Sequence, residues 1–290
     1  MNLLDKPYFA KRVRAVHDTE VRKYICSAPF DEWYSSNKVF EDTGKYKSVY
    51  TNWLLGSRYS NIIGLDKFEE VDFTFGITQS LDDLLFKHKN DRLRIFKYEY
   101  HYTNKIHGNY KHIEEGAIQS GEWVLISLPF CFDGKTPSRL KEVLDSAYEV
   151  GVPVYIDAAF YALSFDFTLD LSHPAIAEVY FSLSKNLGMG FLRTGIRFSN
   201  NPIYGPVSMQ NEYNYSNLAS VQLGAYVISK FDINHTLDKY KRAYKLLCME
   251  NGLSEGNCIH IALGPEEIQG DFLRMNNTTK IGIWWDDEML

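Results

Sequence analysis

The sequence has few cysteines and no long apolar run. Only four of its 290 residues are cysteine, and no two have the C-x-x-C spacing of a metal finger or a redox motif. They are Cys26, Cys131, Cys248 and Cys258. We therefore expect no metal site, and thiols without a pairing pattern favour the reducing cytoplasm. No stretch approaches the ~18 apolar residues of a membrane span, and the N-terminal segment lacks a signal-peptide core, so we expect no membrane association.

The sequence also lacks any block of basic residues. Its net charge is −6 at neutral pH, and its lysines and arginines are spread along the chain. Binding of nucleic acid usually requires clustered positive charge, so the sequence predicts no nucleic-acid partner. Hydrophobic residues make up 45% of the chain, which is enough for a sizeable core. The aromatic share of 15% fits large buried contacts and an interface.

Strand-like and helix-like segments alternate from residue 71 onward. Short β-rich runs are separated by stretches with helical spacing of leucine, valine and alanine. This alternation predicts βαβ units and an α/β fold, in which a mainly parallel sheet is the middle of three αβα layers. The expected strands cover 71–76, 92–100, 122–130, 152–157, 177–182 and 190–199, and the expected helices cover 78–89 and 136–151, the second with Thr136 as N-cap and Gly151 just past its end.

The sequence pattern divides the chain into three parts. Residues 1–45 are polar and aromatic with weak periodicity, and we expect an N-terminal arm with one short helix. Residues 46–210 form the expected large domain. In 211–290 two helical segments precede two strand-like runs, CIHIAL and KIGIWW. This last part predicts a connecting helix and a small, truncated C-terminal α+β domain.

Three turns at the ends of expected strands hold polar or glycine residues. Gly76 follows the first strand, Asp157 ends the strand VPVYID, and Lys185 follows the strand that ends at Ser182. Ligands of parallel sheets gather at the carboxyl ends of the strands, so these turns are candidate site elements. Taken singly, each has an ordinary explanation: a glycine before a helix, an aspartate that caps a turn, and a surface lysine.

Together these segments resemble the fold-type I enzymes of pyridoxal 5′-phosphate (PLP), the aspartate aminotransferase superfamily. SLSKNLGMGFLRTG matches the family pattern S-x-S-K…R-x-G, TFGITQSLDD matches its glycine turn, and VPVYIDAAFYAL matches the segment around its aspartate. The resemblance is clear from about 71 to 198 and faint from there to the end.

The resemblance implies a role for each matched residue. Lys185 would form a Schiff base with the cofactor and carry a proton at the substrate α-carbon. Asp157 would keep the pyridine nitrogen protonated. An aromatic ring would lie over the cofactor, and a guanidinium, a hydroxyl and the amides of a helix N-terminus would hold the phosphate. The residues concerned are Tyr100 for the ring and Arg193, Ser182, Gly76, Ile77 and Thr78 for the phosphate.

Three positions depart from the family pattern. Cys131 stands where the family has an asparagine, and Phe160, followed by Tyr161, stands where it has a tyrosine. Both family residues donate to the 3′-oxygen of the cofactor, and losing them should raise the basicity of the imine. Lys280 lies near the position of the arginine that binds the substrate carboxylate, and Arg274 is the closest arginine. Lysine binds a carboxylate as a point charge rather than as a fork.

The resemblance implies an aminotransferase that acts on an amino acid or a related amine and forms a homodimer, with Tyr46 or Tyr50 reaching the partner's phosphate site. A PLP-dependent lyase or decarboxylase stays open, because the 3′-oxygen environment is altered. A catalytically degenerate protein that keeps the fold for binding or regulation also stays open, although the retained Lys185 and Asp157 oppose it.

Overall fold

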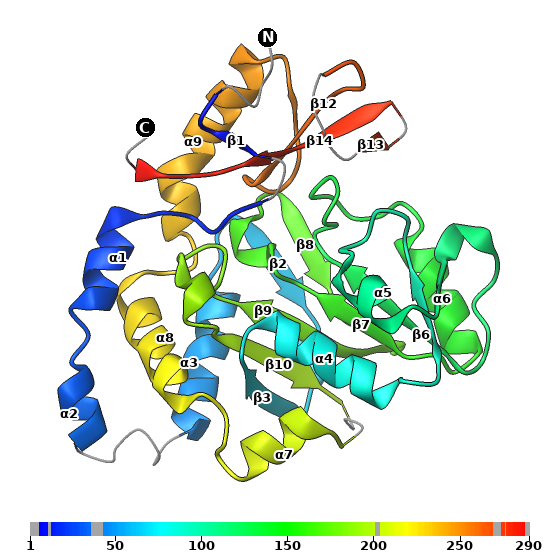
Figure 1. The fold of residues 1–290 in the computed structure, drawn as a ribbon, viewed down its shortest axis with the longest axis horizontal. Coiled ribbons are helices and arrows are strands. Elements are labelled where there is room, and N and C mark those ends of the chain that lie inside the picture. The colour runs from blue at the N-terminus through cyan, green and yellow to red at the C-terminus, as the bar shows by residue number, and fades with distance from the viewer. Residues whose placement is uncertain are drawn as a thin grey trace.

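A seven-stranded sheet lies at the centre of the larger part of the molecule (Figure 1). The computed structural model describes residues 6–10, 13–35, 43–200, 204–268, 274–275 and 277–287. The strand order is β3-β10-β9-β7-β6-β4-β5, and only β10 runs antiparallel to its neighbours. The expected mainly parallel sheet is thereby confirmed. The bounds are β3 Glu70–Thr74, β4 Arg92–Ile95, β5 Tyr110–His112, β6 Glu122–Ser127, β7 Val154–Asp157, β9 Ile176–Ser182 and β10 Gly195–Ser199.

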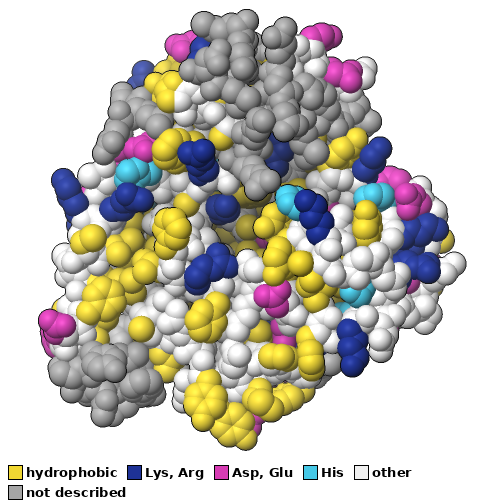
Figure 2. Space-filling model, viewed as in Figure 1, with side chains coloured by type: hydrophobic (Ala, Val, Ile, Leu, Met, Phe, Trp, Pro, Cys, Tyr) yellow, Lys and Arg dark blue, Asp and Glu magenta, His cyan; other side chains and the backbone are white. Residues whose placement is uncertain are grey.

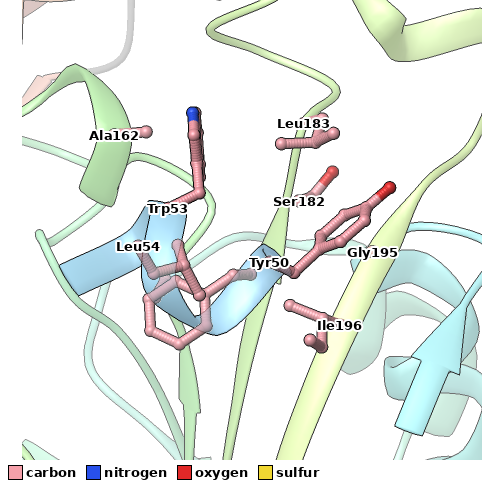
Figure 3. Close-up of a pocket in the computed structure, with 10 residues that line it drawn as sticks. Tyr50, Trp53, Leu54, Ala162, Ser182, Leu183, Gly195 and Ile196 are labelled. Atoms are coloured by element: carbon pink, nitrogen blue, oxygen red, sulfur yellow. The ribbon is translucent and has the colours of Figure 1, made fainter. Parts of the chain in front are cut away.

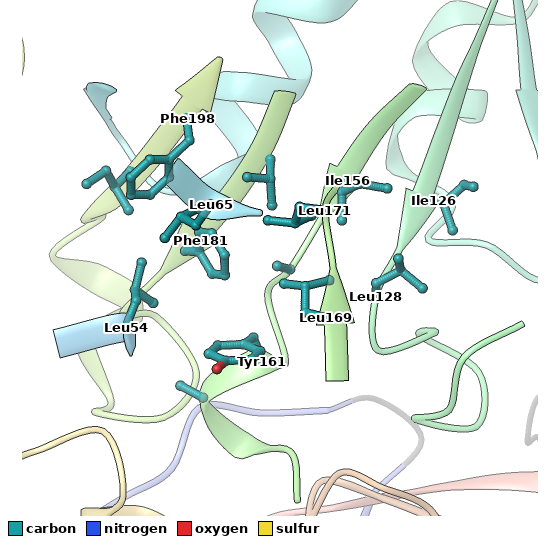
Figure 4. Close-up of a cluster of buried hydrophobic side chains, with 14 of the residues drawn as sticks. Leu54, Leu65, Ile126, Leu128, Ile156, Tyr161, Leu169, Leu171, Phe181 and Phe198 are labelled. Carbon is teal, nitrogen blue, oxygen red and sulfur yellow. The ribbon is translucent and has the colours of Figure 1, made fainter. Parts of the chain in front are cut away.

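Helices cover both faces of this sheet, as the buried strand β6 illustrates. Trp123 and Leu125 belong to one buried cluster, which includes residues of α4. Val124 and Ile126, which alternate with them, belong to another cluster, with residues of α3, α6 and α8 (Figure 4). A strand buried on both faces is typical of a three-layer αβα arrangement. The helices are α3 Thr43–Leu55, α4 Ile77–Lys87, α5 Tyr102–His107, α6 Leu140–Glu149, α7 Pro206–Glu212 and α8 Leu218–Lys230.

A second, antiparallel sheet forms the small α+β part that the sequence predicts. Its order is β1-β14-β12-β11, with β13 also paired to β14. It packs on one side of α9 through a separate buried cluster that includes Tyr244, Ile281 and Trp285. The bounds are β1 Phe9–Ala10, β11 Ser254–Glu255, β12 Ile261–Pro265, β13 Arg274–Met275, β14 Thr278–Ile283 and α9 His235–Glu250.

Several elements differ from the expected ones. The N-terminal part contains two helices rather than one, α1 (Thr19–Cys26) and α2 (Phe30–Ser35), and it adds β1 to the small sheet. The second expected helix begins only at Leu140, because Pro137 first forms a turn that Leu140 closes with a 3.0 Å hydrogen bond. A parallel pair, β2 (Ser60–Ile63) with β8 (Phe167–Asp170), was not predicted.

Several expected strands are shorter than their sequence pattern, and two of them, β4 and β10, by five residues each. The strand expected over 92–100 ends at Ile95, and Tyr98 then adopts φ 70° in the following turn. The strand expected over 190–199 begins at Gly195, because Met189–Phe191 forms a 3-10 turn instead. No helix in the described ranges combines the length and the apolar character that crossing a membrane requires.

A buried ion network connects α4 to the antiparallel part of the sheet. Arg197 on β10 is fully buried and donates to Asp83 at 2.8 Å and to Asp72. Glu178 lies 3.6 Å from the same guanidinium. Lys87 Nζ completes the network at 2.7 Å from Asp83 and 3.2 Å from Glu178. Since a buried charge is tolerated only when it is paired, this network fixes where α4 begins relative to β3 and β10.

Candidate active site

The register of β10 brings two candidate turns to one edge of the large sheet. Gly195 pairs with Thr74 of β3 on one side and with Ser182 of β9 on the other. Asp157 lies at the corresponding end of β7, where it pairs with Tyr180. The turns after Thr74, Asp157 and Ser182 therefore meet at the same edge. Figure 2 shows Lys and Arg side chains around a hollow in the middle of one face of the molecule.

The glycine turn and Arg193 form a compact, positively charged corner. Gly76 adopts φ +69° as the N-cap of α4, and Arg193 Nη2 donates to Thr78 Oγ1 at 2.8 Å. A Cβ atom on Gly76 would lie 3.1 Å from Arg193 Nη2, so a side chain there would crowd the guanidinium. The backbone amides of Ile77 and Thr78 belong to the first turn of α4. A helix N-terminus beside a guanidinium is a suitable site for a phosphate.

Ser182 lies at the end of β9, but its hydroxyl is engaged within the chain. It donates to Ser184 Oγ at 2.7 Å and accepts from the amide of Ser184 at 3.0 Å. These bonds shape the turn that leads to Lys185. A hydroxyl can accept a second hydrogen bond, so Ser182 could accept one from a ligand and keep its present contacts. To donate to a ligand, it would have to give up its hydrogen bond to Ser184.

Lys185 and Asp157 are both largely withdrawn from solvent, and each influences the pKa of the other. Burial lowers the pKa of Lys185, the attraction of Asp157 raises it, and the positive charges of Arg193 and Lys280 lower it. Burial raises the pKa of Asp157 to about 7, against the hydrogen bond from the Ala159 amide and the attraction of Lys185. Lys185 Nζ also donates to the carbonyl of Val13 at 3.4 Å. An amine with a lowered pKa is a better nucleophile at neutral pH.

Glu99 is a second buried carboxylate that the sequence analysis missed. Its oxygens accept from the hydroxyl of Ser127 at 2.6 Å, from the amide of Ser127 at 2.8 Å and from the amide of Tyr100 at 2.7 Å. Burial raises its pKa, and its negative charge in turn raises the pKa of Asp157. In the sequence, Glu99 stands between Tyr98 and Tyr100, and only its acidic character within an aromatic run indicates it.

Tyr100 lies at the exposed rim of the site. Its side chain is 44% exposed, and its ring stacks on Tyr102 with 6.3 Å between centroids. Tyr102 in turn donates to Asp82 at 2.6 Å, and this hydrogen bond is the main reason that the pKa of Tyr102 is raised to about 12, against the lowering effect of Arg193. Tyr100 and Tyr102 together thus form an aromatic rim near the positively charged corner.

Lys280 and Cys131 are brought together by a direct hydrogen bond. Lys280 Nζ on β14 donates to the carbonyl of Cys131, and its charge lowers the pKa of Lys185. The Cys131 thiol is already engaged, since it donates to the carbonyl of Tyr98 at 3.3 Å. Arg274 belongs to β13, but its side chain lies outside the described residues.

His260 is a further site residue that the sequence analysis did not identify. It precedes β12, is fully buried, and meets the ring of Phe160 edge-on with centroids 6.4 Å apart. Burial and then the charge of Lys185 lower its pKa to about 3. In the sequence it stands inside the apolar run CIHIAL, which indicates a strand and conceals the histidine.

Tyr50 cannot reach the phosphate site of a partner subunit as expected. Its hydroxyl is buried between α3 and α8, where it donates to the carbonyl of Val221 at 3.0 Å. Figure 3 shows Tyr50 beside Ser182 and Leu183, at a cavity of about 10 Å³ beneath the site. That volume suits one water molecule at most, so this cavity is part of the packing and not a cofactor site.

Solved structures share the fold of this chain. The aspartate aminotransferase from Thermotoga maritima has a TM-score of 0.69 at 12% identity, over 96% of this chain and 88% of that one. The tyrosine aminotransferase from Leishmania infantum has a TM-score of 0.65 at 11% identity, over 93% and 86%. The histidinol-phosphate aminotransferase from Clostridium acetobutylicum has a TM-score of 0.64 at 14% identity, over 96% and 94%.

No protein-family model and no curated protein matches the chain by sequence. At identities this low, the structural likeness establishes an aminotransferase-like fold and leaves the reaction to be argued from the residues.

Proposed function

We propose that the protein is a PLP-dependent aminotransferase that acts on an amino acid or a related amine. The observation that carries this proposal is the sheet register that brings the turns of Asp157 and Lys185 to one edge, beside the corner that Gly76 and Arg193 form. An amine, a carboxylate and an anion-binding corner at one sheet edge match the three groups of PLP: the aldehyde, the pyridine nitrogen and the phosphate. When bound, this cofactor supplies an electron-accepting ring to the α-carbon of an amine.

The residues at the phosphate corner fit a dianion. Arg193 presents a guanidinium fork, Thr78 a hydroxyl, and Ile77 a backbone amide at the start of α4. The absence of a Cβ on Gly76 leaves room for close approach to the backbone. Ser182 would add its hydroxyl from the end of β9.

At the other end of the site, two residues would share the proton chemistry. Asp157 would hold a proton on the pyridine nitrogen. Burial raises the pKa of Asp157, and a protonated pyridine nitrogen beside it would favour the ionised carboxylate. Lys185 would bond covalently through Nζ to the aldehyde and, once released, move a proton at the substrate α-carbon. Tyr100 would cover one face of the ring. Lys280 would attract the substrate carboxylate, with Arg274 as a second candidate.

Reductive labelling tests the covalent role of Lys185. Borohydride treatment of the protein with PLP should fix the cofactor to Lys185, as identified by peptide mass spectrometry, and Lys185→Ala should abolish this labelling. Lys280→Ala is the matched control, because Lys280 is a half-buried amine in the same site, and it should label normally. Labelling of a different lysine in the wild type would refute the proposal.

A lyase or decarboxylase is the second candidate, favoured by one observation. Phe160 has no polar atom and the Cys131 thiol is engaged with Tyr98, so neither donates to the 3′-oxygen. Transfer of an amino group to a keto-acid acceptor supports the first candidate, and release of ammonia or carbon dioxide supports the second. Labelling at Lys185 with no turnover on a broad panel of amines would instead indicate a degenerate protein that retains the fold for binding.

We also propose that the protein is a homodimer that works in the cytoplasm. Its described surface exposes apolar side chains around α7, and Phe191 is 95% exposed (Figure 2). Exposed apolar patches of this kind mark interfaces. Met209 lies in α7, and Tyr204, Tyr213 and Tyr215 flank this helix. All four cysteines are free, which suits a reducing compartment. Sedimentation equilibrium of the wild type and of Phe191→Asp tests the dimer.

A further inference from the structure

His260 is a buried imidazole for which the described residues offer no hydrogen-bond partner. Its side chain is fully buried, and neither Nδ1 nor Nε2 finds a partner among the residues that the structure describes. Buried polar groups in native proteins are almost always paired, because an unpaired one keeps the cost of losing water. The imidazole therefore indicates a partner that the described residues do not supply.

The position of His260 identifies where that partner would lie. The imidazole meets Phe160 edge-on, and Phe160 follows Asp157 by three positions in the chain. After burial, the charge of Lys185 is the second cause that lowers the pKa of His260, so the two side chains are within electrostatic range of each other. The carbonyl of His260 accepts from the amide of Ile283 at 2.9 Å, which fixes the residue to the small sheet beside β14. His260 thus reaches the site from the small sheet, on the Lys185 side.

The charge state of His260 suits it to donate a hydrogen bond. Burial and the neighbouring Lys185 both disfavour the imidazolium, so the pKa of His260 falls and the ring is neutral near pH 7. A neutral imidazole carries one N–H donor and one acceptor nitrogen. It can therefore donate to an anionic oxygen without adding a charge beside Lys185.

We propose that His260 donates a hydrogen bond to the phenolic oxygen of PLP. This inference rests on the proposed function. In PLP the phenolic oxygen is on the ring carbon next to the one that bears the aldehyde. His260 meets Phe160, the position from which the resemblance implies a donor to this oxygen, so its imidazole is suitably placed to reach it. The two positions from which the resemblance implies donors cannot provide them, since Phe160 is apolar and the Cys131 thiol donates to Tyr98. His260, from a different sheet, takes over their role.

The test compares two cofactors that differ by one atom. We would measure the affinity of wild type, His260→Phe and His260→Gln for PLP and for 3-deoxypyridoxal phosphate, which lacks the phenolic oxygen. His260→Phe should weaken PLP binding by roughly tenfold, the effect of one charge-assisted hydrogen bond, and should leave the affinity for the deoxy analogue unchanged. His260→Gln retains a donor and should lose less. Thermal unfolding of the cofactor-free variants verifies that they fold.

A spectroscopic readout tests the same contact independently of affinity. A donor to the phenolic oxygen withdraws electron density from the nitrogen that Lys185 contributes, so its loss makes that nitrogen more basic. The pH midpoint of the absorption change of bound PLP should therefore rise by about one pH unit in His260→Phe. Adding Phe160→Tyr to His260→Phe places a phenol at the same corner and should restore part of the affinity for PLP.

Three outcomes would overturn the inference. Equal losses for PLP and the deoxy analogue would mean that His260 only supports the packing. Unchanged affinity and midpoint would mean that it does not contact the cofactor. A loss confined to the affinity for amino acids would mean that it binds the substrate carboxylate. If the wild type itself fails to bind PLP or to label at Lys185, the proposed function fails; if the wild type binds and only the His260 effects are absent, this inference alone fails.

Discussion

Arg193 donates a 2.8 Å hydrogen bond to Thr78, although 115 positions separate the two residues in the sequence. Arg193 adopts φ +53° just before β10, and Thr78 belongs to the first turn of α4. The bond joins a guanidinium to the positive end of a helix, and two such groups repel each other unless an anion lies between them. The first prediction follows from this pair.

Arg193→Met should weaken binding of PLP by roughly 10–100-fold, because the phosphate loses a bidentate, charge-assisted partner. Pyridoxal, which has no phosphate, should bind the variant and the wild type equally. Equilibrium dialysis with both compounds measures the difference. Arg139→Met removes an exposed arginine far from this corner and should change neither affinity. A similar loss for pyridoxal would show that Arg193 does not act on the phosphate.

Asp157→Asn should stabilise the cofactor-free protein at alkaline pH. The carboxyl pKa is raised from 3.8 to about 7 in the folded state. Between these values the folded state binds more protons than the unfolded state, so the free energy of unfolding falls as the pH rises from about 4 to about 7. The loss is on the order of a few kcal/mol, since one pKa unit corresponds to about 1.4 kcal/mol.

Asparagine stays neutral at every pH, so the Asp157→Asn variant does not lose this part of the free energy of unfolding as the pH rises. Urea denaturation of wild type and Asp157→Asn should therefore give similar free energies of unfolding near pH 4 and a more stable variant at pH 8. Parallel pH profiles for the two proteins would contradict the raised pKa. The same substitution should weaken PLP binding, because a neutral amide does not hold the pyridine nitrogen in its protonated form. Stability and function thus oppose each other at this residue.

Arg197→Met should destabilise the protein by about 3–5 kcal/mol, because it leaves buried carboxylates without their cation. The groups affected are Asp72, Asp83 and Glu178, with only Lys87 remaining among them. Urea denaturation measures the change. The matched control is again Arg139→Met, whose exposed ion pair with Glu142 should contribute about 0–1 kcal/mol. Equal effects of the two substitutions would rule out a structural role for the buried network.

Gly224→Ala should destabilise the packing of α8 on α3. A Cβ atom at this position would lie 1.8 Å from Tyr50 Oη and 3.0 Å from Tyr50 Cζ. Overpacking of this kind typically costs about 1–3 kcal/mol, which outweighs the gain of about 1 kcal/mol that alanine brings to a helix interior. Thermal unfolding should show a lower Tm. Tyr50→Phe removes the nearest atom and should restore part of the loss.

Gly44→Ala is the control for this prediction. Gly44 lies in α3, and no atom of the described residues lies within 4 Å of a Cβ atom built on it. Alanine should therefore raise the Tm slightly through its helix propensity. If both glycine variants lower the Tm equally, crowding against Tyr50 is not the cause.

Local patterns in the sequence predicted six of the seven strands of the large sheet, and missed the short edge strand β5. The predicted strands are apolar runs, each with a turn at its end, and this pattern identifies them in the sequence. Asp157 and Lys185 were identified because they stand in such turns. Strands whose pairing partner is far away in the sequence were missed. The strands β2 and β8 are short and half polar, and β1 is visible only through its pairing with β14.

The missed site residues have the same physical explanation. His260 and Glu99 act through three-dimensional neighbours that come from other elements, Lys185 and Phe160 for the first and Ser127 and Asp157 for the second. Their sequence surroundings are an apolar strand and an aromatic turn, which predict burial alone. The buried position of the Tyr50 hydroxyl likewise depends on Gly224, 174 residues later.

The pairing of β1 with β14 determines when the site can be completed during synthesis. Phe9 pairs with Ile283, and the segment after β1 brings the carbonyl of Val13 to Lys185 Nζ. On the ribosome, β1 emerges before β14 and cannot pair with it until β14 has been synthesised. The large sheet can form earlier, but Val13 is not held beside Lys185 until β1 pairs with β14. A nascent chain arrested before β14 would thus leave this side of Lys185 uncovered.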